Sequence, residues 1–297
     1  ESRIVPASIA GVGASGIGPC MLPVDVDGAP LMNAVLYGVD TRAAREIAEL
    51  NAEIGQETLL ARCGNTLTSQ SVGPKILWLK RNRPELFART HKILNSTSFL
   101  VHRLTGRYTV DHHTAAGSSP LYLADEQKWS ADIAPEIAPL ELLPDIHWTT
   151  DIVGEVHEAA AGETGLAAGT PVIAGTIDAV AEAVSLGVTA PGDMMLMYGS
   201  TIFIILITPE RVRDGRLWYA PWVFPGQHGA MSGLATSGTL THWFRNQFAR
   251  ELPAATSAPT LAAAAAASPP GAKGLVVLPY FSGERTPLHD PAAKGLF

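Results

Sequence analysis

The sequence predicts a mixed α/β fold built in two parts. Short apolar runs typical of buried strands occur in groups, and segments with helical periodicity separate these groups. Hydrophobic residues make up 46% of the 297 residues and charged residues 16%, which is enough to bury one large core or two ordinary ones. The segment Thr189–Gly192, which contains Pro191, divides an earlier from a later group of elements and is typical of a crossover between domains.

Strands and then helices are expected in the first half of the chain. The strands are short apolar runs, the second followed by an Asp27–Gly28 turn, at Ser8–Ala14, Met21–Val26 and Ala34–Tyr37. The helices have apolar residues at helical spacing and are expected at Thr41–Ile54, Ser71–Arg81, Pro84–Arg89 and Asn95–Leu104. Thr41 is the expected N-cap of the first helix.

The later elements alternate between strand and helix. Pro171–Ala174 is expected to be a buried strand, and Asp178–Leu186 a helix of small residues that ends at Gly187. Beyond the crossover, the remaining strands and helices are expected at Met194–Tyr198, Ile202–Ile207, Ser237–Arg250, the surface alanine run Ala262–Ala267 and Gly274–Leu278.

Composition argues against several classes of protein. The net charge is -7 and there is no block of Lys or Arg, which disfavours a nucleic-acid partner. The two cysteines, Cys20 and Cys63, lie far apart, so we expect a reduced, cytoplasmic protein without a disulfide framework or a cysteine-based zinc site. The uncharged stretch Ile4–Val24 is interrupted by many Gly and Pro residues, so it predicts strands and turns, and we expect no membrane association.

Two apparent motifs are expected to be structural. Gly11–Gly16 spells GxGxxG, but Gly18 and Pro19 follow where a dinucleotide site needs a helix, which favours a tight turn between strands. His112 and His113 are adjacent, and neighbours in an extended segment point in opposite directions, which disfavours a joint metal site.

The strongest candidate for chemistry is Gly175–Asp178, between a buried strand and a helix. This places a carboxylate at the carboxyl end of a strand, where α/β sheets gather their ligands. The alternative is that Asp178 only caps the helix, which is a common use of Asp.

Three further segments combine glycine with polar residues. Tyr198–Thr201, between two strands, offers backbone N–H and hydroxyl donors to phosphate, or it is an ordinary hairpin turn. Tyr37–Arg42 and Ser282–Pro287 follow strands and carry Asp, Arg or Glu, so each is either a site or an ion pair that clasps domains. Taken singly, the clasp is the preferred interpretation for both.

Together, these segments form an ordered series along almost the whole chain. Its members are Asp40–Arg42, Lys75–Asn82, Leu104–Gly106, Gly165–Val172, Asp178, Gly199–Thr201 and Leu278–Pro287. The series resembles the FGGY carbohydrate kinases, which phosphorylate pentuloses, gluconate, glycerol and related polyols. The resemblance implies an actin-like ATPase fold of two ribonuclease-H-like domains. It also implies a sugar-binding domain at 1–188, the start of an ATP-binding domain at 189–297, and a hinge near Gly187–Gly192.

The resemblance also assigns roles to residues. Asp178 matches the family's general base. The substrate-binding positions are Ser15, Gly16, Ile17, Gly18 and Asp40, with Asp178 itself, and Gly199, Ser200 and Thr201 match the second phosphate loop. ATP and Mg²⁺ are the expected cofactors, a sugar or polyol the expected partner, and a homodimer is left open.

The chain departs from the family pattern in three places. The first phosphate loop is expected before Glu1 and the adenosine-binding glycines after Phe297, so the chain is expected to be an inactive central fragment of a kinase. Ile17–Pro19 replaces the Gln-Met-His of xylulose kinases, which leaves the substrate open. The first hypothesis is an active ATP-dependent kinase of a sugar, sugar acid or polyol, with a pentulose such as xylulose or ribulose as the favoured substrate. The second is a catalytically inactive sugar or nucleotide sensor of the same fold, and the third is a dinucleotide oxidoreductase based on Gly11–Gly16.

Overall fold

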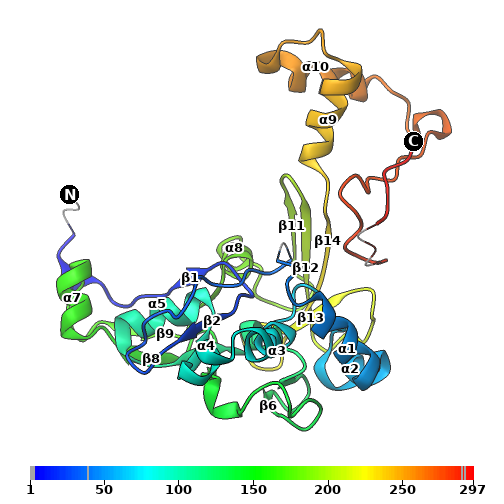
Figure 1. Cartoon of the computed structure of the whole chain (residues 1–297). Helices are drawn as coiled ribbons and strands as arrows, with labels where there is room; N and C mark the ends of the chain where they lie inside the picture. Colours follow the sequence, from blue (N-terminus) through cyan, green and yellow to red (C-terminus); the bar gives the residue numbers. More distant parts are fainter. Residues whose placement is uncertain (1–3, 39, 289, 291) are drawn as a thin grey trace. The chain divides into compact units, whose positions relative to one another are not determined.

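The computed structural model describes residues 4–38, 40–288, 290 and 292–297, and its chain divides into two compact units (Figure 1). Unit 1 contains Glu1–Asp193, Ile207–Gly215 and Tyr219–Ala230. Unit 2 contains Met194–Leu206, Arg216–Trp218 and Met231–Phe297.

Unit 1 contains most of the described helices, and capping residues explain where some of them begin and end. The α-helices are α1 (Ala44–Ile54), α2 (Gln56–Cys63), α3 (Gly73–Asn82), α4 (Pro84–Arg89), α5 (Ser96–Thr105), α6 (His112–Ala116), α7 (Glu158–Thr164) and α8 (Asp178–Ser185), with 3₁₀ turns at Pro6–Ser8 and Leu140–Leu142. The side chain of Asn95 caps α5 by accepting the N–H of Ser98 at 3.0 Å. Gly106 ends the same helix with a left-handed φ of 72°.

The strands that lie wholly within unit 1 pair two by two. The parallel pairs are β1 (Ser15–Gly16) with β10 (Thr176–Ile177) and β4 (Thr109–Asp111) with β7 (Asp145–His147). The antiparallel pairs are β2 (Leu22–Val24) with β3 (Lys92–Leu94), β5 (Tyr122–Leu123) with β6 (Lys128–Trp129), and β8 (Ile152–Glu155) with β9 (Pro171–Ile173). The first pair joins segments from opposite ends of the unit and positions the candidate site.

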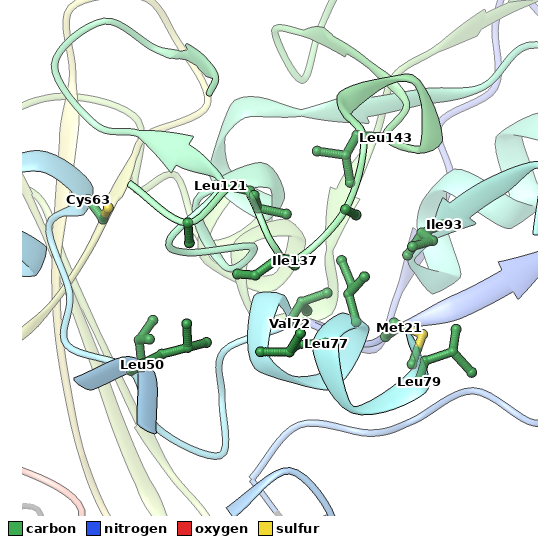
Figure 2. Packing of buried hydrophobic residues seen from close by; sticks show 14 of the residues in the cluster. Met21, Leu50, Cys63, Val72, Leu77, Leu79, Ile93, Leu121, Ile137 and Leu143 are labelled. Atoms are coloured by element: carbon green, nitrogen blue, oxygen red, sulfur yellow. The ribbon is translucent and has the colours of Figure 1, made fainter. Parts of the chain in front are cut away.

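The largest core of unit 1 lies around α3, which contributes Ile76, Leu77 and Leu79 (Figure 2). Leu50 from α1 and Met21 from the segment before β2 pack in the same cluster. Burying one such side chain stabilises the fold by about 1.5–3 kcal/mol, so this cluster holds α1, α2 and α3 together. A smaller cluster around Val101 and Val172 packs α5 against β9 and α7.

Unit 2 is built on part of a four-stranded sheet. The strand order is β11 (Met194–Tyr198), β12 (Ile202–Thr208), β14 (His228–Leu234) and β13 (Trp218–Pro221), and the unit boundary runs through β12, β13 and β14. β11 and β12 form an antiparallel hairpin (Figure 1). Two helices follow, α9 (Gly238–Phe248) and the alanine-rich, mostly exposed α10 (Ala254–Ala266), and then the 3₁₀ turn Ala272–Gly274.

Several predicted strands are wrong because their apolar runs do not form ladders. In Ser8–Ala14 only Val12 forms a bridge, and in Ala34–Tyr37 only Val35 does. Gly274–Leu278 begins in a 3₁₀ turn and pairs only at Leu278, and its apolar side chains are exposed.

The predicted N-cap Thr41 is also wrong, since α1 begins at Ala44 with Ala43 at the cap position. The carboxylate of Asp40 accepts the backbone N–H of Arg42 at 3.1 Å, and this local turn delays the helix. By contrast, α4 and β11 have the predicted bounds.

Candidate active site

Asp178 is the first residue of α8, directly after β10. Ile177, not Asp178, occupies the N-cap position, where no side-chain hydrogen bond is formed. Among the described residues, the carboxylate of Asp178 accepts one hydrogen bond, from the N–H of Ala179 at 2.8 Å, and the side chain is exposed. The usual form of helix capping is therefore not observed. A carboxylate in the first turn is still favoured by the helix dipole.

The predicted substrate loop lies beside Asp178. β1 pairs in parallel with β10, so Ser15 is opposite Thr176 and Gly16 is opposite Ile177. The next residues in the two segments are Ile17 and Asp178. The structure therefore brings the loop and the predicted base together, although they lie far apart in the sequence.

Close packing around the loop requires glycine. A Cβ on Gly16 would lie 2.5 Å from the Oγ of Ser96, and a Cβ on Gly18 would collide with the side chain of Ile177. Ile17 between them is 40% exposed, and its carbonyl accepts the hydroxyl of Ser96. The loop is thus held by its backbone while one apolar side chain faces outward.

Ser96 and Thr97, at the start of α5, were not predicted as site residues. Thr97 Oγ1 donates to the carbonyl of Thr176 at 2.9 Å, so α5 fixes both β1 and β10. The sequence signal was limited to the helix start at Asn95, which gives no indication of a distant strand partner.

The GxGxxG segment does not open a helix. Val12 bridges Val172, Ser15–Gly16 forms β1, and no helix starts within residues 9–43 of the described chain. The third hypothesis, a dinucleotide site at Gly11–Gly16, lacks the helix N-terminus that it needs.

Asp40 forms a different local cluster. Its carboxylate accepts two bonds from Nε of Arg42, at 2.9 and 3.0 Å, and the guanidinium lies 4.8 Å from the centre of the Trp78 ring. The hydrogen bonds from Arg42 lower the pKa of Asp40. The described hydrogen bonds of Asp40 go to Arg42, and none joins it to the loop beside Asp178. The ion pair of Tyr37–Arg42 is therefore local to this segment, and the described contacts do not test the predicted domain clasp.

Lys75, part of the K-x-x-W motif, is fully buried beneath that cluster. Its ammonium donates to the carbonyls of Leu36 and Ser69 at 2.8 and 2.7 Å. Burial lowers the pKa of Lys75 to about 8, and the nearby Asp40 carboxylate partly opposes this. Lys75 thereby ties the segment before Asp40 to the loop before α3.

The predicted phosphate loop is the tip of the β11–β12 hairpin in unit 2. The N–H of Gly199 donates to the carbonyl of Thr201 at 2.9 Å, while the side chain of Ser200 is exposed. The N–H groups of Ser237 and Gly238, at the start of α9, donate to Ser200 and Gly199. Helix α9 therefore fixes the carbonyls of the loop, and the Ser200 hydroxyl remains accessible to a ligand.

The Ser282–Pro287 segment is anchored inside unit 2 through a threonine. Thr286 Oγ1 accepts the N–H of Gly233 at 2.8 Å and donates to its carbonyl at 2.9 Å, and it also contacts Ser232. The guanidinium of Arg285 lies 5.1 Å from the centre of the Trp218 ring. The observed contacts indicate a structural anchor on β14.

His112 and His113 start α6 and do not lie in an extended segment as predicted. Their ring nitrogens contact different groups, the Tyr122 hydroxyl and the Pro221 carbonyl. Within the described residues there is no group of three or more His, Cys, Asp or Glu side chains suited to a metal ion. The helices of the described chain also include none with the length and apolarity needed to cross a membrane.

Comparison with known proteins shows that both halves of the chain match domains of the same protein family. Residues 1–185 match the model of the "FGGY family of carbohydrate kinases, N-terminal domain", and residues 194–297 match that of the C-terminal domain. The chain is 29% identical to the xylulose kinase of Bacillus subtilis over 297 residues, covering 99% of the chain and 58% of that protein. It is 30% identical to the xylulose kinase of Escherichia coli over 271 residues, covering 90% and 54%.

The fold is similar to that of a solved xylulose kinase. The crystal structure of the enzyme from Rhodospirillum rubrum matches with a TM-score of 0.90 and 33% identity, over 97% of this chain and 58% of that one. The predicted α/β fold of the actin-like ATPase class is therefore confirmed. The chain spans 58% and 54% of the length of the two curated relatives.

Proposed function

Because the chain belongs to the FGGY family of carbohydrate kinases, we propose that it is the central part of an ATP-dependent sugar kinase. The reaction is phosphorylation of a hydroxyl on a sugar, sugar acid or polyol, and the names of the relatives favour a pentulose such as xylulose or ribulose. The observation that carries this proposal is the pairing of β1 with β10, since it sets Ser15–Gly18 beside the carboxylate of Asp178.

Asp178 is the proposed general base. The substrate oxygen attacks the γ-phosphorus of ATP, its proton passes to the Asp178 carboxylate, and the bond between the γ-phosphorus and the leaving oxygen of ADP breaks. Phosphoryl transfer depends mainly on positioning and charge stabilisation. The exposed carboxylate at the start of α8 is accessible to a bound hydroxyl.

The proposed sugar-binding residues are Ser15, Gly16, Ile17 and Gly18, with Asp40 as an additional acceptor. The Ser15 side chain is exposed next to β10, whereas Ile17 contributes an apolar surface. Arg42 keeps Asp40 ionised by lowering its pKa, so the carboxylate can accept sugar hydroxyls. An apolar Ile17 would select against a substrate with a hydroxyl at that point, because the hydroxyl would lose its hydrogen bonds on binding.

The proposed ATP contact in this chain is Gly199, Ser200 and Thr201. An exposed hydroxyl at a hairpin tip, with a glycine beside it, fits a phosphate group. Mg²⁺ is expected to arrive with ATP and to neutralise phosphate charge, but the described residues contain no ready three-ligand site for it.

The domain assignment follows from these roles. Residues 1–188 form the sugar-binding part and 189–297 the first part of the ATP-binding domain, with the hinge near Gly187–Gly192. A cytoplasmic location agrees with the two free cysteines, Cys20 and Cys63. The proposed homodimer is tested by light scattering, which measures the molar mass in solution.

The test is a substrate panel on the complete natural protein that contains this chain. ADP release is measured with pentuloses, pentitols, tetritols, gluconate and glycerol, and Asp178→Asn is assayed alongside. The proposal expects one compound to stimulate ADP release and the Asn variant to lose most of it. Heat of sugar binding without ADP release from the wild-type protein would instead favour the inactive sensor.

A further inference from the structure

Asp111 is a buried carboxylate that neither the sequence motifs nor the proposed reaction uses. It ends β4 and occupies the N-cap position of α6, yet its side chain forms no capping hydrogen bond there. Only 2% of the residue is exposed. An N-cap Asp ordinarily bonds the first turn of its own helix, whereas this carboxylate accepts hydrogen bonds from segments distant in the sequence.

The distant partners of the carboxylate are two threonine hydroxyls. Thr176 Oγ1 donates to Oδ2 of Asp111 at 2.9 Å, and Thr149 Oγ1 donates to the same oxygen at 3.3 Å. Both threonines are buried. The carboxylate therefore joins β4 to two segments that come from elsewhere in unit 1.

A carboxylate at this depth is costly for the fold. Burial raises the pKa of Asp111, whereas the neighbouring His113 and hydrogen bonds from Thr114 and Thr176 act in the opposite direction. A buried carboxyl group is tolerated when hydrogen bonds satisfy it, and such a network then fixes one arrangement of the groups around it. The network therefore restrains the position of the segments that carry Thr149 and Thr176.

Thr176 links this network to the candidate site. It lies in β10 opposite Ser15, and Asp178 is two residues further on. Its carbonyl accepts Thr97 Oγ1 at 2.9 Å while its hydroxyl donates to Asp111, so the residue is held on two sides. Rotation or slippage of β10 would break these bonds and move the start of α8.

We propose that Asp111 is a positioning residue that acts through the hydroxyl of Thr176 to hold β10, and with it Asp178, in register with the substrate loop. This inference rests on the proposed kinase function. It assigns no contact between Asp111 and the sugar. The expected consequence of losing the bond is a misplaced base: kcat falls, whereas sugar affinity changes little.

The experiment compares two matched substitutions in the complete protein. Thr176→Val and Thr149→Val each remove one hydroxyl donor from Asp111 and keep a β-branched side chain of similar volume. Misplacing a reacting group by about 1 Å can cost about 100-fold in rate, so Thr176→Val should lower kcat by about 10- to 100-fold. Thr149→Val should lower kcat by no more than about threefold, because Thr149 does not lie on the strand that carries Asp178.

Three further measurements separate positioning from a general loss of structure. Both Val variants should lower the unfolding temperature by similar amounts, and the calorimetric sugar affinity of Thr176→Val should remain within about threefold of wild type. Thr176→Ser keeps the hydroxyl and should restore most of kcat.

The possible outcomes distinguish the positioning role of Asp111 from the proposed kinase function. Equal kcat in the two Val variants, or a Thr176→Ser variant as slow as Thr176→Val, would overturn the positioning role while leaving the kinase proposal intact. Absence of turnover in the wild-type protein would overturn both.

Discussion

Gly175, directly before β10, packs against Ala14, directly before β1, and Gly175→Ala should be strongly destabilising. The residue has a φ of 70°, in the left-handed region, which costs an alanine about 1–2 kcal/mol. A Cβ there would also lie under 3.0 Å from the carbonyl oxygen of Ala14 and 3.0 Å from the methyl group of Thr97. Because both neighbours are packed, the overpacking should add about 1–3 kcal/mol.

Gly165→Ala is the matched control. Gly165 has a similar φ of 75°, but a Cβ there would meet nothing within 4 Å. The control should therefore lose only the conformational part, about 1–2 kcal/mol. Chemical denaturation followed by tryptophan fluorescence measures both losses.

The same substitution should affect the site. The added Cβ pushes Ala14, and with it β1 and the substrate loop that follows β1, whereas Thr176→Val affects the strand that leads to Asp178. Gly175→Ala should therefore weaken sugar binding at least about tenfold, equivalent to about 1.4 kcal/mol. Gly165→Ala should leave sugar affinity near wild type. If the two variants lost the same stability and kept wild-type sugar affinity, close packing against Ala14 would not be the reason that position 175 requires glycine.

Three other predictions concern single interactions. Because burial lowers the pKa of Lys75 from 10.5 to about 8, the unfolded chain binds more protons than the folded chain between these two pH values, and stability rises with pH there. In urea titrations, the free energy of unfolding of wild type, relative to that of Lys75→Met, should increase by about 2 kcal/mol between neutral pH and about pH 10. Parallel pH profiles of the two proteins would contradict this. Thr286→Val leaves the N–H and carbonyl of Gly233 without their shared partner and should cost about 1–3 kcal/mol, measured by thermal unfolding against Thr241→Val on exposed α9. Asn95→Ala removes the cap on Ser98 and should cost about 1 kcal/mol, with Asn95→Asp recovering most of it in the same denaturation assay.

Elements with strong local signals were predictable from the sequence. Pro84 at the first helical position fixes the start of α4, and the alternation of apolar runs around Gly199 gives the β11–β12 hairpin. Helix α8 begins at Asp178 as predicted, because a buried strand and a glycine precede it. In each case a few neighbouring residues determine the outcome.

Short strands stabilised by distant partners were not predictable. β4 and β7 each contain three residues, and their parallel pairing depends on contacts between Thr109–Asp111 and Asp145–His147 that no local pattern encodes. The apolar run Gly274–Leu278 shows the converse, since it has strand composition but pairs only at Leu278.

The candidate site shows the same division. Asp178 could be selected because a glycine, a buried strand and a carboxylate occur together in sequence. The proximity of Ser15–Gly18 followed from the family resemblance alone, and the structure supplies its physical basis in the β1–β10 register. The sequence did not predict roles for Ser96, Thr97 and Asp111, because their partners lie far away in the chain. Ser96 and Thr97 bond backbone carbonyls, and Asp111 accepts a threonine hydroxyl.

The most direct test of the account is a single-turnover measurement of phosphoryl transfer in the complete protein, with wild type and Asp178→Asn compared at equal sugar occupancy set by calorimetry. The Asn side chain has nearly the same shape but cannot accept the proton. The account predicts sugar affinity within about threefold of wild type and transfer slowed by about 100- to 10,000-fold. Transfer at the wild-type rate with sugar bound would contradict the assignment of Asp178 as the base.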